Sequence, residues 1–271
     1  MLKEYMKKFI GVIVLFIVSI PVFAGNNEFG VLCYHNVVDE SVKYEKPQYF
    51  PQTISAEVLI SHFDWLKNNG YTPVSWQQIL DARNGKGALP DKAVLLTFDD
   101  GYESFYNVIY PLLKVYNYPA VYAIVTDWIN TPANKKINYG NQKLDRDAFL
   151  TWQQLREIQA SGLVEIASHS NNLHHGIAAN PAGSSLPAII AVEYKNGKYE
   201  THDEYRSRLR KDFQRSYDLL KTNLGVAPRV MVWPYGQFTD EAAHLAEQVG
   251  FDTHMSLVET KINTPEQSHV G

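Results

Sequence analysis

Short apolar segments alternate with segments of helical pattern along most of this chain. The apolar segments are rich in valine, leucine, isoleucine and aromatic residues without alternating polar positions, which is typical of strands buried on both faces. A parallel strand pair needs a crossover connection, and a helix between successive strands supplies it. We expect strands at residues 29–35, 71–74, 93–98, 120–125, 163–167, 229–233 and 251–257.

The segments between these strands carry apolar residues at helical spacing together with start and end signals. Serine or threonine precedes several of them and glycine follows, as at Ser55 and Gly70. Seven strands joined by helices suit either an open doubly wound sheet or a barrel that lacks one strand, and we favour an α/β incomplete (β/α)7 barrel. We expect helices at residues 55–70, 76–83, 105–113, 152–159, 203–224 and 240–249.

The first 24 residues have the pattern of a secretory signal peptide. Three lysines precede an apolar run at residues 9–20, and Ala24 ends a small-residue cleavage site. An uncleaved membrane anchor is the alternative, although the run is short for a membrane-spanning helix. We therefore expect an exported protein of the periplasm or cell envelope. One folded domain should cover residues 28–260, and residues 261–271 look like a tail or the start of a further region.

Composition narrows the class of function. The net charge of −4 and the absence of a basic run in the body of the chain give no indication of nucleic-acid binding. Cys33 is the only cysteine, so one chain cannot form a disulfide, and its apolar surroundings predict a buried strand thiol. We expect a monomer.

Polar groups follow several of the expected strands at their carboxyl ends. Asp99 and Asp100 follow residues 93–98, and His35 ends the first strand. A strand buried on both faces cannot hide a charge, so the carboxylates must lie where the strand stops. In barrels of parallel strands the carboxyl ends form the catalytic face. Asp-Asp-Gly is also a common turn sequence, and the rest of the chain must decide between a turn and a catalytic site.

Histidines after the fifth strand favour the catalytic interpretation. His169 and His174 would point in different directions on a helix, but in a loop they can converge on one point. Two imidazoles and one carboxylate leave open positions on a divalent metal, as catalytic sites require. The alternative is a solvated loop with a hydrogen-bonded histidine at the strand end. The donor set accepts zinc, iron, cobalt or nickel, so the metal is not determined.

Three motifs resemble those of the polysaccharide deacetylases of carbohydrate esterase family 4, whose fold is called NodB-like. They are TFDDGY at residues 97–102, the loop from His169 to His174, and WPYG at residues 233–236. The resemblance implies that Asp100, His169 and His174 hold the metal and that Asp99 is the general base. It also implies that a backbone N–H near Tyr235 binds the oxyanion.

The chain departs from the family pattern at three points. The usual histidine pair is one residue closer, which leaves His175 as a rival to His174. Val232 stands where the family has an arginine, and Arg229 is too far back to replace it. The general acid has two candidates. We favour His35, at a strand end, over His254, in the middle of a strand.

The resemblance is strongest to periplasmic deacetylases that process poly-β-1,6-N-acetyl-D-glucosamine, a biofilm exopolysaccharide. We therefore expect a metal-dependent hydrolase that removes N-acetyl groups from this polymer, with polysaccharide export machinery as a further partner. The alternatives are a chitin or peptidoglycan deacetylase and a non-catalytic glycan-binding or export module. We expect the sugar to contact Trp233, Tyr235 and Tyr102, although Trp233 equally suits the core.

Overall fold

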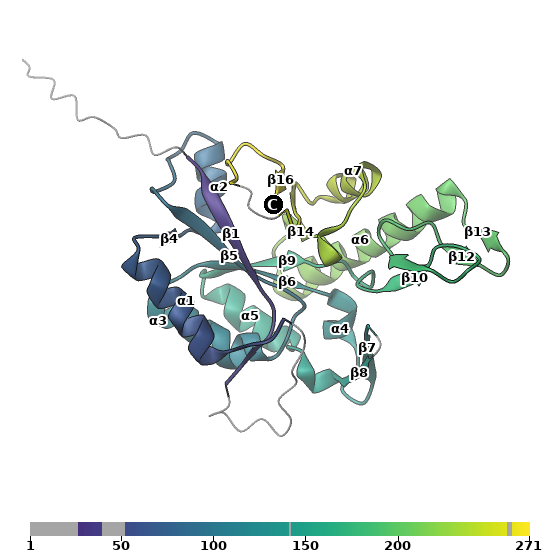
Figure 1. The fold of residues 1–271 in the computed structure, drawn as a ribbon, viewed down its shortest axis with the longest axis horizontal. Helices are drawn as coiled ribbons and strands as arrows, with labels where there is room; N and C mark the ends of the chain where they lie inside the picture. The colour runs from purple at the N-terminus through teal and green to yellow at the C-terminus, as the bar shows by residue number, and fades with distance from the viewer. Residues whose placement is uncertain (1–26, 40–51, 141, 259–261) are drawn as a thin grey trace, which may run out of the picture.

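A single parallel sheet forms the centre of the molecule and curls into an incomplete barrel with helices outside it (Figure 1). The structure is a computed structural model that describes residues 27–39, 52–140, 142–258 and 262–271. The strand order is β1-β5-β6-β9-β14-β15-β16, and β4 also pairs with β5. The strands are β1 (Phe29–Tyr34), β4 (Thr72–Pro73), β5 (Ala93–Phe98), β6 (Ala120–Ile124), β9 (Val164–Ser168), β14 (Val230–Val232), β15 (Thr253–Met255) and β16 (His269–Val270).

This architecture confirms the expected α/β incomplete barrel. Seven of the eight strands lie where the apolar segments predict them, and the eighth, β16, falls in the segment expected to be a tail. Asn263 joins this segment to the rest of the barrel. It pairs with Phe29 of β1 through two backbone hydrogen bonds of 2.9 Å each, and its side chain bonds both backbone groups of Gly271. Residues 262–271 therefore connect β1, which Asn263 contacts, with β15, which pairs with β16. The expected signal peptide lies outside the described residues.

Side-chain caps set the starts of several helices, and those at Ser55, Ser75 and Thr151 are the expected ones. The side chains of Ser55, Ser75, Thr151 and Thr201 cap helices by accepting a backbone N–H in the first turn. The segment after β5 differs from a simple helix, because a π-helical turn at Phe105–Ile109 precedes the α-helix. The helices are α1 (Ala56–Asn68), α2 (Trp76–Arg83), α3 (Tyr110–Tyr116), α4 (Thr126–Asn130), α5 (Trp152–Ala160), α6 (His202–Leu224) and α7 (Asp240–Val249).

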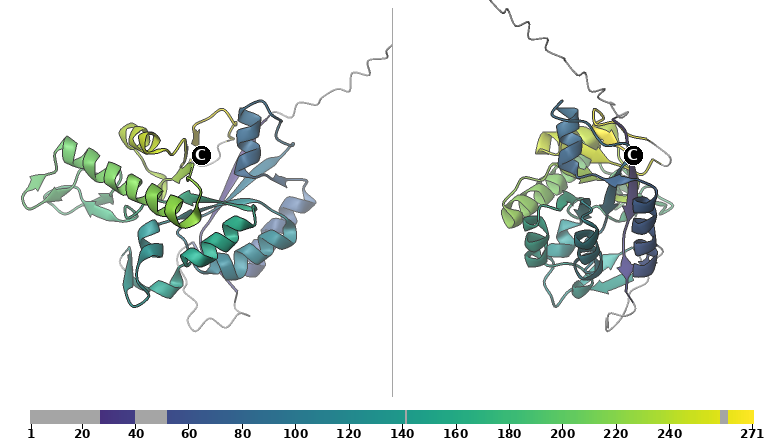
Figure 2. Two further views of the ribbon diagram at one scale, coloured as in Figure 1. Left: turned by 180° about the vertical axis from the view of Figure 1, so that it is seen from behind. Right: turned by 90° about the vertical axis from the view of Figure 1, so that its left-hand side faces the viewer.

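Strand alternation divides the side chains between two layers. Leu95 of β5 and Val121 of β6 belong to the barrel interior, whereas their neighbours Leu96 and Tyr122 belong to the layer beneath the helices. Figures 1 and 2 show α1, α3 and α5 together beside one part of the sheet and α6 and α7 beside another. No helix among the described residues is long and apolar enough to span a membrane. The parity of a residue in its strand thus decides whether it reaches the interior.

Short hairpins lie in long polar segments outside the strands and helices that the sequence predicts. One hairpin follows α4, and two more follow β9 and form an arm that extends along α6 (Figure 1). A further pair joins the end of the first strand region to the start of α1. These elements are β2 (Val37–Val38) with β3 (Ile54–Ser55), β7 (Lys136–Tyr139) with β8 (Gln142–Asp145), β10 (Gly176–Ala178) with β11 (Ser185–Pro187), and β12 (Tyr194–Lys195) with β13 (Lys198–Tyr199).

Candidate active site

Two adjacent carboxylates stand at the carboxyl end of β5. Asp99 continues the inward-facing row of that strand and is 4% exposed, while Asp100 is completely buried. The backbone turns sharply here, because Asp100 has φ 79° and Gly101 has φ 91°. A left-handed conformation is strained for a residue with a side chain and is typical of functional sites. The turn directs the two neighbouring carboxylates to different partners.

Two histidines from the β9 region meet Asp100. Its Oδ1 atom lies 3.3 Å from Nε2 of His174 and 3.7 Å from Nε2 of His169. His169 directly follows β9, and His174 lies in the loop beyond it. The three side chains offer one ligand atom each within 4.8 Å of one another. The structure therefore brings together the predicted metal ligands.

Contacts around this cluster fix its geometry. The main-chain carbonyl of Val232 lies 2.7 Å from Nδ1 of His169, which leaves Nε2 of that ring for the cluster. The hydroxyl of Tyr139 donates a 2.9 Å hydrogen bond to Oδ2 of Asp100. The indole ring of Trp128 packs edge-on against His174 with centroids 5.2 Å apart. Each of the three side chains, His169, Asp100 and His174, is thus oriented by a contact outside the cluster.

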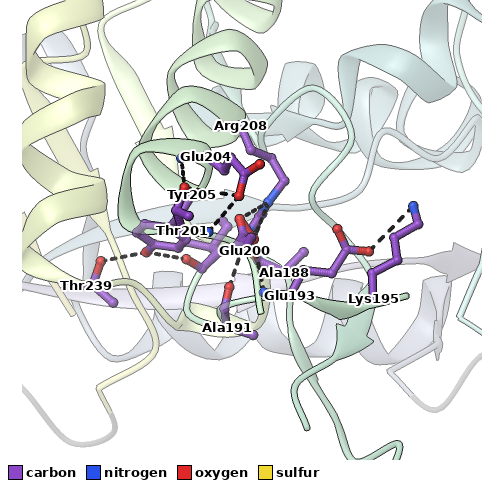
Figure 3. A network of polar contacts seen from close by, with 11 residues as sticks. Ala188, Ala191, Glu193, Lys195, Glu200, Thr201, Glu204, Tyr205, Arg208 and Thr239 are labelled. Carbon is purple, nitrogen blue, oxygen red and sulfur yellow. Dashed lines mark hydrogen bonds and ion pairs between the residues drawn. The ribbon is translucent and has the colours of Figure 1, made fainter. Parts of the chain in front are cut away.

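The loop that carries His174 is itself held by α6. Both carboxylate oxygens of Asp212 accept backbone N–H groups of this loop, from Asn171 and Asn172, at 2.8 Å each. Beyond the loop, Arg208 of α6 bonds Glu200 and the main-chain oxygen of Ala188 (Figure 3). These contacts tie the arm to α6 on the far side of the histidines, so α6 positions both sides of the loop.

Burial and neighbouring charges shift the pKa values of Asp99 and Asp100 in opposite directions. Burial raises the pKa of Asp99 to about 6, against the effect of nearby His35 and with that of Asp100. Burial alone would raise the pKa of Asp100, but His174, His169, His35 and Tyr139 reverse this, and the pKa lies below its ordinary value. Burial lowers the pKa of His169 to about 3, so that ring is neutral. The two carboxylates therefore differ in basicity although they are adjacent.

The two candidates for the general acid lie in different layers of the barrel. His35 follows β1 on its inward-facing row and forms a close group with Cys33 and Asp99. His254 has the opposite parity in β15 and is 1% exposed, with its ring stacked on Trp233. Its Nε2 is 3.9 Å from Glu247 of α7. The structure therefore brings His35, and not His254, to Asp99.

The donor atoms fit a divalent metal. Oδ1 of Asp100 is buried and has no hydrogen-bond partner in the part of the chain that the structure describes. Such an oxygen is costly to bury unless a cation or donor meets it. One carboxylate and two imidazoles suit zinc and the neighbouring transition metals, and three ligands leave positions open for water or substrate.

Comparison with known proteins agrees with this geometry. The sequence profile of the family described as polysaccharide deacetylase matches residues 86–254, which contain both carboxylates and both histidines. The chain belongs to the polysaccharide deacetylase family.

Relatives within the family cover most of this chain. A poly-β-1,6-N-acetyl-D-glucosamine N-deacetylase of Escherichia coli is 43% identical over 86% of the chain. A solved de-N-acetylase from Aggregatibacter actinomycetemcomitans is 59% identical, with a TM-score of 0.86, and the match covers 90% of this chain and 93% of that one. The deacetylase domain of BpsB from Bordetella bronchiseptica is 39% identical, with a TM-score of 0.79, over 90% and 94% of the two chains. The chain spans only 34% of the Escherichia coli relative.

The departures from the family motifs have local explanations. His174 joins the cluster, whereas His175 lies outside it and its main-chain oxygen accepts the N–H of Ala188. Arg229 pairs with Glu165 at 2.8 Å, at the opposite end of β14 from the site. It cannot orient Asp99 from there. Oδ1 of Asp99 accordingly has no hydrogen-bond partner within the described residues.

The three aromatic residues expected to contact sugar lie in different environments. Tyr235 is 42% exposed, and its ring is 4.5 Å from that of His174. Its φ of 60° is again left-handed, like those of Asp100 and Ser170. Trp233 is 1% exposed beneath α6, and Tyr102 is 3% exposed and stacked on Phe149. Of the three, Tyr235 alone presents a surface beside the cluster.

Sequence reasoning missed two residues of this family site. Tyr139 lies in a segment expected to be an irregular loop, and no nearby motif marks it. Asp212 is one of many charged residues of α6, and no motif distinguishes it, yet it bonds the histidine loop. Burial raises the pKa of Asp212 to about 6 despite its two N–H donors.

Proposed function

We propose that this chain is a metal-dependent N-deacetylase that removes acetyl groups from exported poly-β-1,6-N-acetyl-D-glucosamine. The observation that carries the proposal is the difference in surroundings between the two adjacent carboxylates at the end of β5. Asp100 faces two imidazoles, while Asp99, next to it, has a pKa of about 6 and a buried oxygen that no hydrogen-bond donor among the described residues meets. Ligand and base are thereby separate groups on adjacent residues.

Asp100, His169 and His174 would hold the metal, which when bound would acidify water and polarise the acetamide carbonyl. Asp99 is the general base and takes the proton of the attacking water. Its raised pKa suits this role, because a base titrating near the working pH combines sufficient basicity with an available lone pair. His35 then protonates the departing sugar amine from the other side of Asp99, as its place in the Cys33 and Asp99 group allows.

Tyr235 supplies two further contacts. Its backbone N–H donates to the oxyanion, and its exposed ring, beside His174, packs against the sugar. Trp233 and Tyr102 are both buried, so Tyr235 is the aromatic residue that we assign to the sugar. The left-handed backbone at Tyr235 holds the residue in the orientation that both contacts use.

The choice of polymer rests on the relatives. Those from Escherichia coli and Staphylococcus aureus are both named poly-β-1,6-N-acetyl-D-glucosamine N-deacetylases, at 43% and 24% identity. The amino-terminal signal pattern supports export to the periplasm or envelope, where such a polymer is met. Export machinery is a further partner of the proposed enzyme.

Acetate release from purified protein with added divalent metal tests the proposal. The substrates are β-1,6-linked N-acetylglucosamine oligomers, with chitin oligomers and peptidoglycan fragments as comparisons. We expect turnover of the β-1,6 oligomers above the others. Faster turnover of chitin or peptidoglycan would refute the assigned substrate. If no substrate releases acetate although bound metal has been verified, the assigned deacetylase activity is wrong.

One variant and its matched control test the roles of the two carboxylates. Asp99→Asn should abolish turnover and leave intact the binding of a metal ion by Asp100, His169 and His174, because Asp99 lies outside that group of ligands. Asp91→Asn, an exposed carboxylate before the same strand, is the matched control and should keep full activity. If Asp99→Asn loses the metal ion bound by Asp100, His169 and His174, the separate roles of Asp99 as base and Asp100 as ligand are contradicted.

A further inference from the structure

A second group of ligand-type side chains lies beside the candidate catalytic cluster. Cys33, His35 and Asp99 each offer one ligand atom within 4.8 Å of the others. The alternation of parallel strands explains the group, because Cys33 and His35 are two residues apart on the inward row of β1 and Asp99 continues the inward row of β5. Cys33 has no part in the proposed reaction.

An unsatisfied oxygen points to a missing ligand in this group. Oδ2 of Asp99 is 3.4 Å from Sγ of Cys33, whose thiol donates to it. Oδ1 of the same carboxylate is buried and has no partner within the described residues, although the residue is only 4% exposed. A buried carboxylate oxygen normally has a donor or a cation, so this one stands ready for a cation.

The donor set selects the class of cation. A thiolate, an imidazole and a carboxylate together suit zinc and other thiophilic divalent ions, whereas magnesium, calcium and manganese prefer oxygen ligands alone. The first cluster has no sulfur. A cavity of about 370 Å³ between β1 and the β14–β16 strands is lined by Cys33 and Asp99 and provides space next to the group.

We propose that Cys33, His35 and Asp99 form a second site, which binds zinc and inhibits the enzyme. Binding transfers the thiol proton of Cys33 to solvent and forms bonds from the sulfur, the imidazole and the carboxylate to the ion. The inhibition rests on the proposed function, because the ion would occupy the groups assigned as base and acid. Repulsion from a neighbouring divalent ion makes the second site the weaker one, so it fills at excess zinc.

The chain offers a selective probe of this site. Cys33 is its only cysteine, so any thiolate-to-metal charge-transfer absorption reports this site and no other. We would titrate the metal-loaded protein with cadmium and record this absorption, and count bound zinc by equilibrium dialysis. Cys33→Ser is the test variant, because its hydroxyl still donates to Asp99 while oxygen is a poor replacement for the thiolate. His35→Gln is a second variant, which replaces the imidazole ligand with an amide.

We expect the wild type to show the absorption and to bind a second zinc ion. Both variants should weaken cadmium or zinc binding at this site by at least about 10-fold to 100-fold, the usual effect of disturbing a metal's surroundings. His174→Ala, which removes a ligand of the first cluster, should keep the absorption. Excess zinc should inhibit deacetylation by the wild type and not by Cys33→Ser.

Absence of the absorption in wild-type protein, or equal zinc stoichiometry in the wild type and Cys33→Ser, would overturn the site. Inhibition by zinc that persists in Cys33→Ser would overturn its inhibitory role. Failure of the proposed function is distinguishable, because a protein without deacetylase activity that shows the cysteine-dependent absorption still has the second metal site.

Discussion

The hydroxyl of Tyr139 offers a sharp test of how the metal ligands are positioned. Tyr139→Phe removes the hydroxyl that donates the 2.9 Å hydrogen bond to Oδ2 of Asp100, and it keeps the ring that packs near His174. The change leaves the three ligand side chains themselves intact. Any effect on metal binding therefore acts through the orientation and charge of Asp100.

The structure sets the size of the expected effect. A hydrogen bond to a charged group contributes about 1.5–3 kcal/mol, and this one is buried at a carboxylate that is completely inaccessible. Since about 1.4 kcal/mol corresponds to a tenfold change in an equilibrium constant, full expression at the metal would weaken affinity about 10-fold to 100-fold. Removing outer contacts of metal ligands usually has an effect of this size.

Metal affinity is measured by competition with a chromogenic chelator at fixed pH. Tyr116→Phe is the matched control, because it deletes a tyrosine hydroxyl that donates a 2.7 Å bond to Asp64 at an exposed position away from the site. We expect its metal affinity to equal that of the wild type. Unchanged affinity in Tyr139→Phe, with the fold intact by circular dichroism, would refute the view that this hydroxyl holds Asp100.

Three further substitutions test other parts of the structure. Asp212→Asn should destabilise the fold by about 1–3 kcal/mol in urea unfolding and weaken metal binding, because one of the acceptors for Asn171 and Asn172 becomes a donor; an unchanged metal affinity would contradict the role of α6. Asn263→Ala should lower the free energy of unfolding by about 1–3 kcal/mol through loss of its two side-chain bonds, and an unaltered unfolding midpoint would show that residues 262–271 contribute nothing. Burial lowers the pKa of His254 to about 4 in the folded protein. Below about pH 6.5 the unfolded chain therefore binds more protons than the folded one, and the free energy of unfolding decreases as the pH is lowered. Between about pH 7 and about pH 5, the free energy of unfolding of His254→Phe should therefore decrease by about 2 kcal/mol less than that of the wild type. Equal decreases in the two proteins would argue against a buried neutral ring.

Prediction from sequence succeeded where one residue type in one local pattern settles the outcome. The capping serines and threonines fixed helix starts, because their side chains bond the first turn without help from the rest of the fold. The buried run at residues 93–98 placed Asp99 and Asp100 at a strand end, since a charge cannot remain inside such a strand. Parallel strand topology then predicted which polar groups share one edge.

Prediction was weaker where contacts join distant segments. The tail expected at residues 261–271 contains β16, whose pairing with β15 depends on an edge that exists only after the barrel has folded. The arm and hairpins after β9 carry no strong periodicity, so they were expected to be loops. Tyr139 reaches Asp100 from a hairpin that no motif marks.

The sequence by itself determined the class of chemistry, because the carboxylate pair, the spaced histidines and the strand ends are local features with few alternatives. Tertiary structure decided between the alternative candidates for the same role. It selected His174 over His175 and brought His35, not His254, to Asp99, since the path of a loop and the parity of a strand residue fix where a side chain points. It also placed Cys33 against Asp99, which lies 66 positions further along the chain. That contact depends on the pairing of β1 with β5, which only the folded barrel brings about.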